Sequence, residues 1–342
     1  MERIVIGRTG LEAYRLGFGG IPIQTVSETQ AVETVRHAIE RGVDFIDTSR
    51  GYTTSERRIG LALKQTDKKV LLASKSKDRT ADGIRRDLEI SLKELQRDYI
   101  DLHQLHYVKD ETEYRQVISP GGALEGLRKA KEEGLIGHFG ITSHSLAILD
   151  RAVDDGLFDT IMVCFSFLEC ASREKVIPKA LQKNIGVIAM KPFSGGFIED
   201  ARLALKYTLA HPGILVLAGV ERKDLFDQNW KIFQEERGLT QGEEKEIEEL
   251  QKLYDKVFCR RCEYCQPCSE EIPIHIVINI RTFVKRRGKE ILSRQGPHRE
   301  AIEKARNCTA CGECMPRCPY ELPIPDLIHD SLRWVDEEMK SS

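Results

Sequence analysis

The chain has 342 residues, of which 54 are acidic and 52 are Lys or Arg, so its formal charge is −2 at pH 7. This charge argues against nucleic acid and anionic membranes as partners, and no apolar run is long enough for a membrane helix. The amino-terminal sequence lacks the apolar core of an export signal, so we expect a cytoplasmic protein. The length suits a barrel of about 250 residues with a smaller second domain.

Eight short apolar segments recur in the first two thirds of the chain, and segments with helical periodicity lie between them. Apolar strands that alternate with amphipathic helices are typical of a parallel sheet covered on its outer face. Eight such units predict a (β/α)8 TIM barrel within residues 1–238. Its first helix is expected to begin at a capping box formed by Ser27 and Gln30. The expected strands are 15–19, 43–47, 70–74, 100–105, 138–142, 160–165, 186–190 and 214–218.

Polar residues stand where three consecutive expected strands end. Asp47 ends the second strand, with Tyr52 five residues later, Lys75 ends the third, and His106 follows the fourth. Active sites of such barrels lie at this edge of the sheet. Each residue alone could be a loop cap, a solvated charge or a packing residue, but as a set they predict an active site. His103, inside the fourth strand, is expected to face away from it.

These residues give the chain a resemblance to the aldo-keto reductases over about residues 3–235. The likeness rests on the Asp-x4-Tyr spacing in FIDTSRGY and on LASK, IDLHQLH, HFGITS, AMKPFSGG and AGVERKDLFDQN. It implies reduction of an aldehyde or ketone by NADPH or NADH, with Tyr52 as general acid, Lys75 and Asp47 as its charged partners, and His106 orienting the carbonyl. A free tyrosine, with a pKa of about 10, needs such a neighbouring cation to act as an acid near neutral pH.

The same resemblance implies a nucleotide site. Thr142 and Ser143 would hold the nicotinamide carboxamide, and the small-residue loop 194–196 would wrap the pyrophosphate, because glycines permit close backbone approach. Such a loop by itself is most often only a turn. The expected cofactor-binding residues are Gly19, Gly20, Asp47, Thr142, Ser143, Met190, Pro192, Ser194, Gly195, Gly196, Gly219, Val220, Glu221, Arg222, Gln228 and Asn229.

Three positions depart from the family's usual pattern. Met190 stands where an aromatic ring often stacks on the nicotinamide, which leaves FMN open as a replacement, and Met162 stands where a side-chain amide is common. Glu221 occupies a place where a cation would suit a 2′-phosphate, although Arg222 is adjacent. An acid there favours a free 2′-hydroxyl and therefore NADH.

Two cysteine passages follow a charged segment, 239–258, that we expect to be a helical linker with an apolar stripe of Ile247, Leu250 and Leu253. The linker would either pack on the barrel or remain a solvated helix. The passages contain eight of the ten cysteines, spaced C-x2-C-x2-C-x2-C and C-x2-C-x2-C-x3-C. Such spacing is typical of a metal site rather than of disulfides. Cys164 and Cys170, outside the passages, are expected to be ordinary buried thiols.

The two passages are internal copies of each other. Pro273-Ile274 follows the fourth cysteine of the first passage by five residues, and Pro323-Ile324 does the same in the second. This repeat predicts a pseudo-twofold module over residues 259–342. Short gaps let a loop present its thiolates to one iron–sulfur cubane. A pair of zinc knuckles is the alternative, because four thiolates also suit tetrahedral zinc.

Over residues 255–330 the chain resembles the two-cluster ferredoxins, and the long segment between the copies predicts a mostly helical, ferredoxin-like domain. Ser269 departs from that pattern, since proline usually follows the fourth cysteine. The resemblance implies two [4Fe–4S] clusters whose ligands cross between the copies. One cluster would take Cys259, Cys262, Cys265 and Cys318, and the other Cys308, Cys311, Cys314 and Cys268.

Three functions fit this combination. The first, which we favour, is a carbonyl reductase whose clusters are structural or sense redox state. The second is an electron-transfer enzyme that couples the clusters to a flavin or substrate in the barrel and binds an external ferredoxin-like protein. The third is a non-catalytic nicotinamide-binding protein, which the complete set of Asp47, Tyr52, Lys75 and His106 disfavours. The sequence does not identify the substrate.

Overall fold

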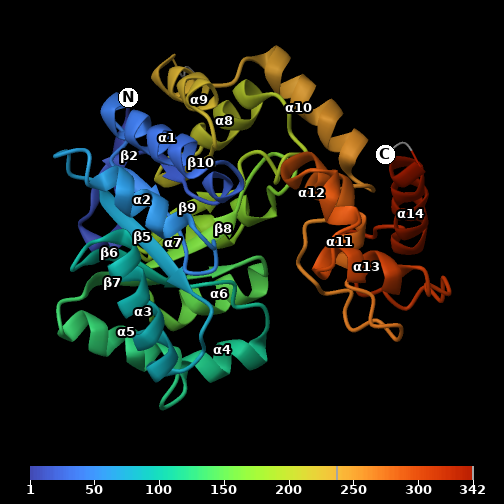
Figure 1. The fold of residues 1–342 in the computed structure, drawn as a ribbon, viewed down its shortest axis with the longest axis horizontal. Helices are drawn as coiled ribbons and strands as arrows, with labels where there is room; N and C mark the ends of the chain where they lie inside the picture. The colour runs from blue at the N-terminus through green and yellow to red at the C-terminus, as the bar shows by residue number, and fades with distance from the viewer. Residues whose placement is uncertain (236–237, 341–342) are drawn as a thin grey trace. The chain divides into compact units, whose positions relative to one another are not determined.

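The computed structural model describes residues 1–235 and 238–340, and its contacts divide the chain into two compact units (Figure 1). The first unit contains residues 1–194 and 198–240, and the second contains residues 195–197 and 241–342. The barrel was expected within residues 1–238. The segment expected as a linker, 239–258, belongs mainly to the second unit.

The first unit contains the predicted closed barrel of eight parallel strands. Successive strands are neighbours around the barrel, and the last one pairs with both its predecessor and the first. All eight observed strands overlap the expected ones. They are β3 (Leu16–Gly19), β4 (Phe45–Asp47), β5 (Leu71–Ser76), β6 (Ile100–Leu105), β7 (Ile136–Ser143), β8 (Thr160–Cys164), β9 (Gly186–Met190) and β10 (Ile214–Gly219).

Amphipathic helices cover the outside of the barrel (Figure 1). The first begins with half of the expected capping box: the Ser27 hydroxyl accepts from the Gln30 N–H at 3.2 Å, but the Gln30 side chain donates to the Glu221 carbonyl at 3.3 Å. The helices are α1 (Glu28–Arg41), α2 (Ser55–Leu63), α3 (Ala81–Leu95), α4 (Glu111–Ile118), α5 (Ala123–Glu132), α6 (Leu146–Asp155), α7 (Val176–Gln182), α8 (Ala201–Leu209) and α9 (Lys223–Glu235).

A short antiparallel hairpin, which the sequence did not predict, precedes the barrel. It pairs β1 (Arg3–Val5) with β2 (Glu12–Tyr14). Ile6 and Ala13 join the apolar cluster that fills the barrel interior, and a Cβ on Gly7 would lie 2.2 Å from the backbone nitrogen of Gly186. Since Gly186 begins β9, the hairpin lies at the amino ends of the strands. The opposite, carboxyl ends carry the candidate site.

The second unit is mostly helical, as predicted, with α10 (Gln241–Tyr254), α11 (Ile274–Ile278), α12 (Ile280–Arg287), α13 (Pro297–Ala305) and α14 (Ile324–Lys340). The sequence repeat is also a repeat of backbone conformation. The two copies start a helix at Ile274 and at Ile324, and each has a left-handed residue three positions after its fourth cysteine, Glu271 at φ 52° and Glu321 at φ 50°.

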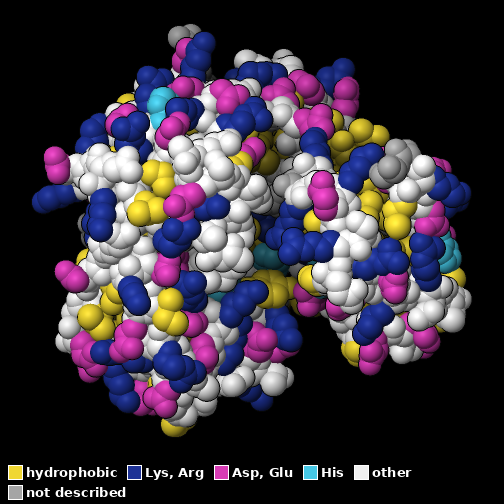
Figure 2. Space-filling view, viewed as in Figure 1, with side chains coloured by type: hydrophobic (Ala, Val, Ile, Leu, Met, Phe, Trp, Pro, Cys, Tyr) yellow, Lys and Arg dark blue, Asp and Glu magenta, His cyan; other side chains and the backbone are white. Residues whose placement is uncertain are grey.

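The linker helix differs from its expected pattern at one position. Ile247 is buried, but Leu253 is 65% exposed, so the predicted apolar stripe is incomplete. On the face shown in Figure 2, basic and acidic side chains are interspersed, in keeping with the formal charge of −2. Among residues 1–235 and 238–340, no helix combines the length and apolar character needed to cross a membrane.

Candidate functional site

The structure brings the four predicted catalytic residues together at the carboxyl ends of β4, β5 and β6. The Lys75 ammonium donates to Asp47 Oδ2 at 2.6 Å and to the Thr48 carbonyl at 2.6 Å. Its Nζ lies 5.1 Å from the centre of the Tyr52 ring, and that ring meets His106 edge-on, with centroids 5.4 Å apart. The phenol therefore lies between an ammonium and an imidazole.

Backbone hydrogen bonds to the neighbouring strand position the loop that carries Tyr52. The Thr48 N–H donates to the Ala73 carbonyl at 2.8 Å, and the Arg50 N–H donates to the Lys75 carbonyl at 2.9 Å. A turn follows, in which the Tyr52 N–H donates to the Ser49 carbonyl at 2.9 Å. The loop thus lies along the end of β5.

Electrostatics fix the charge states of two of these residues. Burial lowers the pKa of Lys75, but the charge of Asp47, together with Tyr52 and hydrogen bonds to both, outweighs it and raises that pKa above its ordinary value. Burial, and then the cations Lys75, Lys77 and Arg79, hold the pKa of His106 well below its ordinary value. Near neutral pH the site therefore contains a charged lysine and a neutral histidine.

Ser49 is a site residue that the sequence analysis missed. Its hydroxyl lies 2.8 Å from His106 Nδ1 and 3.2 Å from the Lys75 carbonyl, and it accepts from the Gly51 N–H at 3.1 Å. By engaging Nδ1, Ser49 leaves Nε2 of the imidazole for a ligand. The only sequence signal was its position two residues after Asp47.

His103, as expected, is not part of this group. It is fully buried inside β6, and neither ring nitrogen has a hydrogen-bond partner among the described residues. Burial, and then the charge of Lys75, lower its pKa to about 4.

One acceptor at the site remains for a ligand. Asp47 Oδ1 is buried and has no hydrogen-bond partner among the residues that the structure describes. Because buried polar atoms are rarely left unpaired, this oxygen fits a site that receives a hydroxyl donor such as a ribose.

Several predicted cofactor residues lie together at the ends of adjacent strands. Gly19 ends β3 and pairs with Gly219, which ends β10. A Cβ on Gly19 would lie 3.2 Å from Gly219 Cα, and one on Gly20 would lie 2.8 Å from the Asp47 carbonyl. Side chains at these two buried positions would therefore clash with the neighbouring strand ends, so both positions require glycine.

Other predicted cofactor residues already have protein partners. Thr142 Oγ1 accepts from the Tyr107 N–H at 2.8 Å, and the Ser143 hydroxyl donates to the Val108 carbonyl at 2.6 Å. Ser194 Oγ lies 2.7 Å from Ser166 Oγ. Because the Thr142 hydroxyl accepts in this contact, its own proton is not used by it.

The methionines and thiols of the barrel differ in how deeply they are buried. Met162 is buried in the barrel interior, and Met190 packs against the same cluster. Pro192, two residues after Met190, is buried. Cys164 is buried as expected, but Cys170 is only half-buried.

The predicted adenosine-end residues lie after β10 and in α9. Val220 and Asn229 are buried, and Gln228 is exposed. Arg222, beside Glu221, donates to both carboxylate oxygens of Asp224 at 3.0 and 2.8 Å. The Arg222 side chain next to Glu221 is therefore engaged by Asp224, an acid in the first turn of α9.

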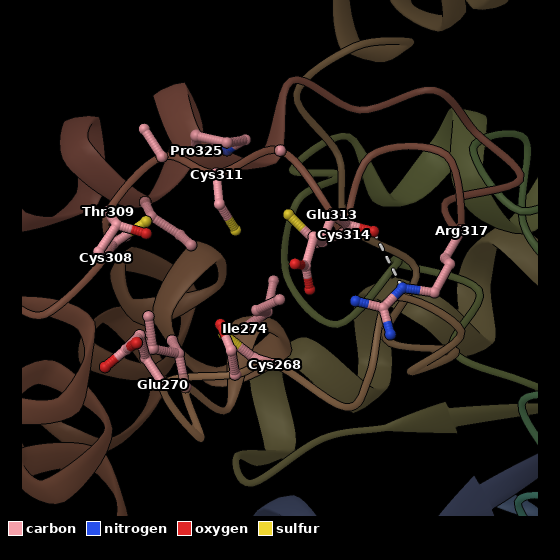
Figure 3. Close-up of a pocket in the computed structure, with 15 residues that line it drawn as sticks. Cys268, Glu270, Ile274, Cys308, Thr309, Cys311, Glu313, Cys314, Arg317 and Pro325 are labelled. Atoms are coloured by element: carbon pink, nitrogen blue, oxygen red, sulfur yellow. Dashed lines mark hydrogen bonds between the residues drawn. The ribbon is translucent and has the colours of Figure 1, made fainter.

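The cysteines gather into two sets, each with members from both passages. Cys268 of the first passage lines a pocket with Cys308, Cys311 and Cys314 of the second (Figure 3). In Figure 3 the side chains of Cys311 and Cys314 point into this pocket, and Cys268 lies across it. Cys311 is exposed.

The other set is more buried. Burial, and then the thiols of Cys259, Cys262 and Cys318, raise the pKa of Cys265 to about 12. Burial raises the pKa of Cys262 to about 11, although a hydrogen bond from the Tyr264 backbone acts in the opposite direction and lowers it. Thiols so placed bind as thiolates only when a cation compensates their charge.

Within the described ranges, 1–235 and 238–340, no group of three His, Cys, Asp or Glu side chains converges as the ligands of one metal ion would. This finding confirms neither the predicted clusters nor the zinc alternative.

Comparisons with known proteins concern the first unit. A model of the aldo/keto reductase family matches residues 15–202. L-galactose dehydrogenase of Arabidopsis thaliana is 31% identical over 220 residues, which are 58% of this chain and 68% of that protein. An aldo-keto reductase of Bacillus subtilis is 27% identical over 227 residues, which are 61% of this chain and 66% of that protein. The chain thus spans about two thirds of these relatives.

Solved structures match the same fold. An aldo-keto reductase of Bacillus halodurans in its holo form superposes with a TM-score of 0.63 at 24% identity, over 73% of this chain and 96% of that one. An aldo/keto reductase of Klebsiella pneumoniae in complex with NADP and acetate superposes with a TM-score of 0.62 at 22% identity. The match covers 73% of this chain and 95% of that one. At these identities the likeness is one of fold.

Proposed function

The chain belongs to the aldo/keto reductase family of oxidoreductases, and we propose that it reduces an aldehyde or ketone with a nicotinamide dinucleotide. The contacts of Tyr52 with Lys75 and His106 carry this proposal. The unpaired Asp47 Oδ1 suits a hydroxyl donor of a bound dinucleotide.

When bound, the reduced nicotinamide supplies the hydride. Tyr52 donates its phenolic proton to the carbonyl oxygen as that oxygen becomes an alkoxide. The Lys75 ammonium stabilises the phenolate that remains, and Asp47 and the Thr48 carbonyl fix its position. Neutral His106, held at Nδ1 by Ser49, orients the carbonyl through Nε2.

The test is Tyr52→Phe, measured as anaerobic oxidation of NADH or NADPH with a panel of aldehydes and ketones. We expect turnover to be abolished and dinucleotide affinity to be nearly unchanged. Tyr99→Phe is the matched control, because Tyr99 is 42% exposed and immediately precedes the amino end of β6. Substantial carbonyl reduction by Tyr52→Phe would contradict the assignment.

We further propose that the second unit binds two [4Fe–4S] clusters. The spacing of the cysteines and their grouping into two crossed sets support this. Cys268, Cys308, Cys311 and Cys314 would hold one cluster, and the more buried set of Cys259, Cys262, Cys265 and Cys318 the other. Protein purified without oxygen should contain iron and acid-labile sulfide in equal amounts, whereas bound zinc without sulfide would refute the proposal.

A second candidate function is electron transfer between the clusters and the barrel. The exposure of Cys311 favours it, because an exposed cluster can exchange electrons with an external ferredoxin-like protein. Hydride carries two electrons and a cluster accepts one, so this function also needs a flavin such as FMN. Adding NADH and then NADPH to anaerobic protein tests it. Bleaching with a reduced-cluster EPR signal would support electron transfer, and an unchanged spectrum in nucleotide-bound protein would favour the simple reductase.

A further inference from the structure

A buried carboxylate lies behind the catalytic loop, on the outer side of the barrel wall. Glu56 is 1% exposed and lies in the first turn of α2. Its Oε1 accepts from the Ser74 hydroxyl at 2.6 Å. Successive side chains of a strand face opposite sides of a sheet, and both neighbours of Ser74 face inward, Ala73 in the interior cluster and Lys75 in the candidate site. Glu56 therefore contacts the outer face of β5, where it cannot touch a ligand at the rim.

The same carboxylate holds the loop that carries Tyr52. Its Oε2 accepts from the Arg50 guanidinium, and the Arg50 side chain is itself only 24% exposed. Arg50 follows Ser49, whose hydroxyl lies 2.8 Å from His106 Nδ1. It also precedes Tyr52 by two residues. The ion pair of Arg50 and Glu56 thus joins the two ends of the loop, one on each side of Tyr52.

This ion pair restricts where the loop can lie. A buried carboxylate is costly unless a cation and hydrogen bonds compensate its charge, so the Arg50 side chain is confined to one place and its backbone with it. Misplacing a catalytic group by about 1 Å can slow a reaction by about 100-fold. An acid in the first turn of a helix also stabilises that helix, which is the simpler role that an experiment must separate from positioning.

We propose that Glu56, acting through Arg50, is a positioning residue that holds the loop of Tyr52 in the geometry for proton donation. The inference rests on the proposed function, since it takes Tyr52 as the acid. Ser74 supplies the second anchor, because it joins the carboxylate to the strand residue that precedes Lys75. One carboxylate thus connects the segments that carry the acid and its neighbouring cation.

The test measures steady-state carbonyl reduction and dinucleotide dissociation constants on full-length protein prepared without oxygen. Glu56→Gln keeps the shape of the side chain and removes its charge, and Arg50→Met removes the partner. Each should lower kcat by roughly 10- to 100-fold, the effect of a misplaced catalytic group, and leave dinucleotide affinity nearly unchanged. Because the pair acts as one unit, the double variant should be no slower than the slower single variant. Glu2→Gln is the matched control, because Glu2 pairs with the buried Arg15 at 2.5 Å, next to the amino end of β3.

Failures of the two proposals can be told apart. If the unmodified protein oxidises neither NADH nor NADPH with any carbonyl of the panel, the proposed function is refuted and this role with it. If it does, and Glu56→Gln keeps kcat within a few-fold, only the positioning role is refuted. An equal loss of kcat and dinucleotide affinity also overturns it, since that result indicates a structural effect, and so does a double variant slowed by the product of the two single effects. Should Glu56→Gln not fold, Arg50→Met is judged by the same comparison of kcat with affinity.

Discussion

Replacing Lys75 with methionine should slow carbonyl reduction by about two orders of magnitude. The Lys75 Nζ lies 5.1 Å from the Tyr52 ring centre, and the lysine is 1% exposed, so solvent screens the pair little. At an effective dielectric constant of about 20, two unit charges at this distance interact by about 3 kcal/mol. Losing that stabilisation of the developing phenolate corresponds to a roughly 100- to 200-fold lower kcat.

The design must allow for the partner of Lys75. Removing one member of a buried ion pair costs about 3–5 kcal/mol of stability, because the remaining charge of Asp47 is uncompensated. We would therefore measure Lys75→Met beside the double variant Lys75→Met/Asp47→Asn. Single-turnover oxidation of bound NADH reports the chemical step apart from product release. A folded double variant with full iron content and a rate within a few-fold of the unmodified protein would refute the reasoning.

Three further predictions follow from particular contacts. His103 has a folded-state pKa of about 4, below its unfolded value, so the unfolded chain binds more protons than the folded chain between about pH 6.5 and 4. The free energy of unfolding should therefore fall by about 3 kcal/mol as the pH drops through that window. In urea unfolding followed at several pH values, His103→Leu should flatten this dependence. Cys318→Ser and Cys268→Ser should each remove about half of the iron. Only Cys268→Ser should remove the EPR signal of the more exposed cluster. Loss of all the iron, or of none, from either variant would contradict the assignment of the cysteines to two crossed sets of ligands. Because Asp224 engages Arg222 next to Glu221, NADH should bind more tightly than NADPH, and Asp224→Asn should narrow that difference in equilibrium binding.

The sequence predicted the barrel and its rim because few physical rules determine them. Apolar strands alternating with helices imply a parallel sheet, and all strands of such a barrel end on one side. Asp47, Lys75 and His106 could therefore be placed from strand ends alone. Ser49 could not, since its contact with His106 depends on the course of a loop that no periodicity encodes.

Long-range partners account for the remaining differences. Gln30 was expected to complete a local capping box, but its side chain donates to the carbonyl of Glu221, far away in sequence. The hairpin of β1 and β2 escaped notice because three-residue strands show too little alternation. Likewise, nothing in the small-residue loop after Met190 indicates that Gly195 packs against Arg261.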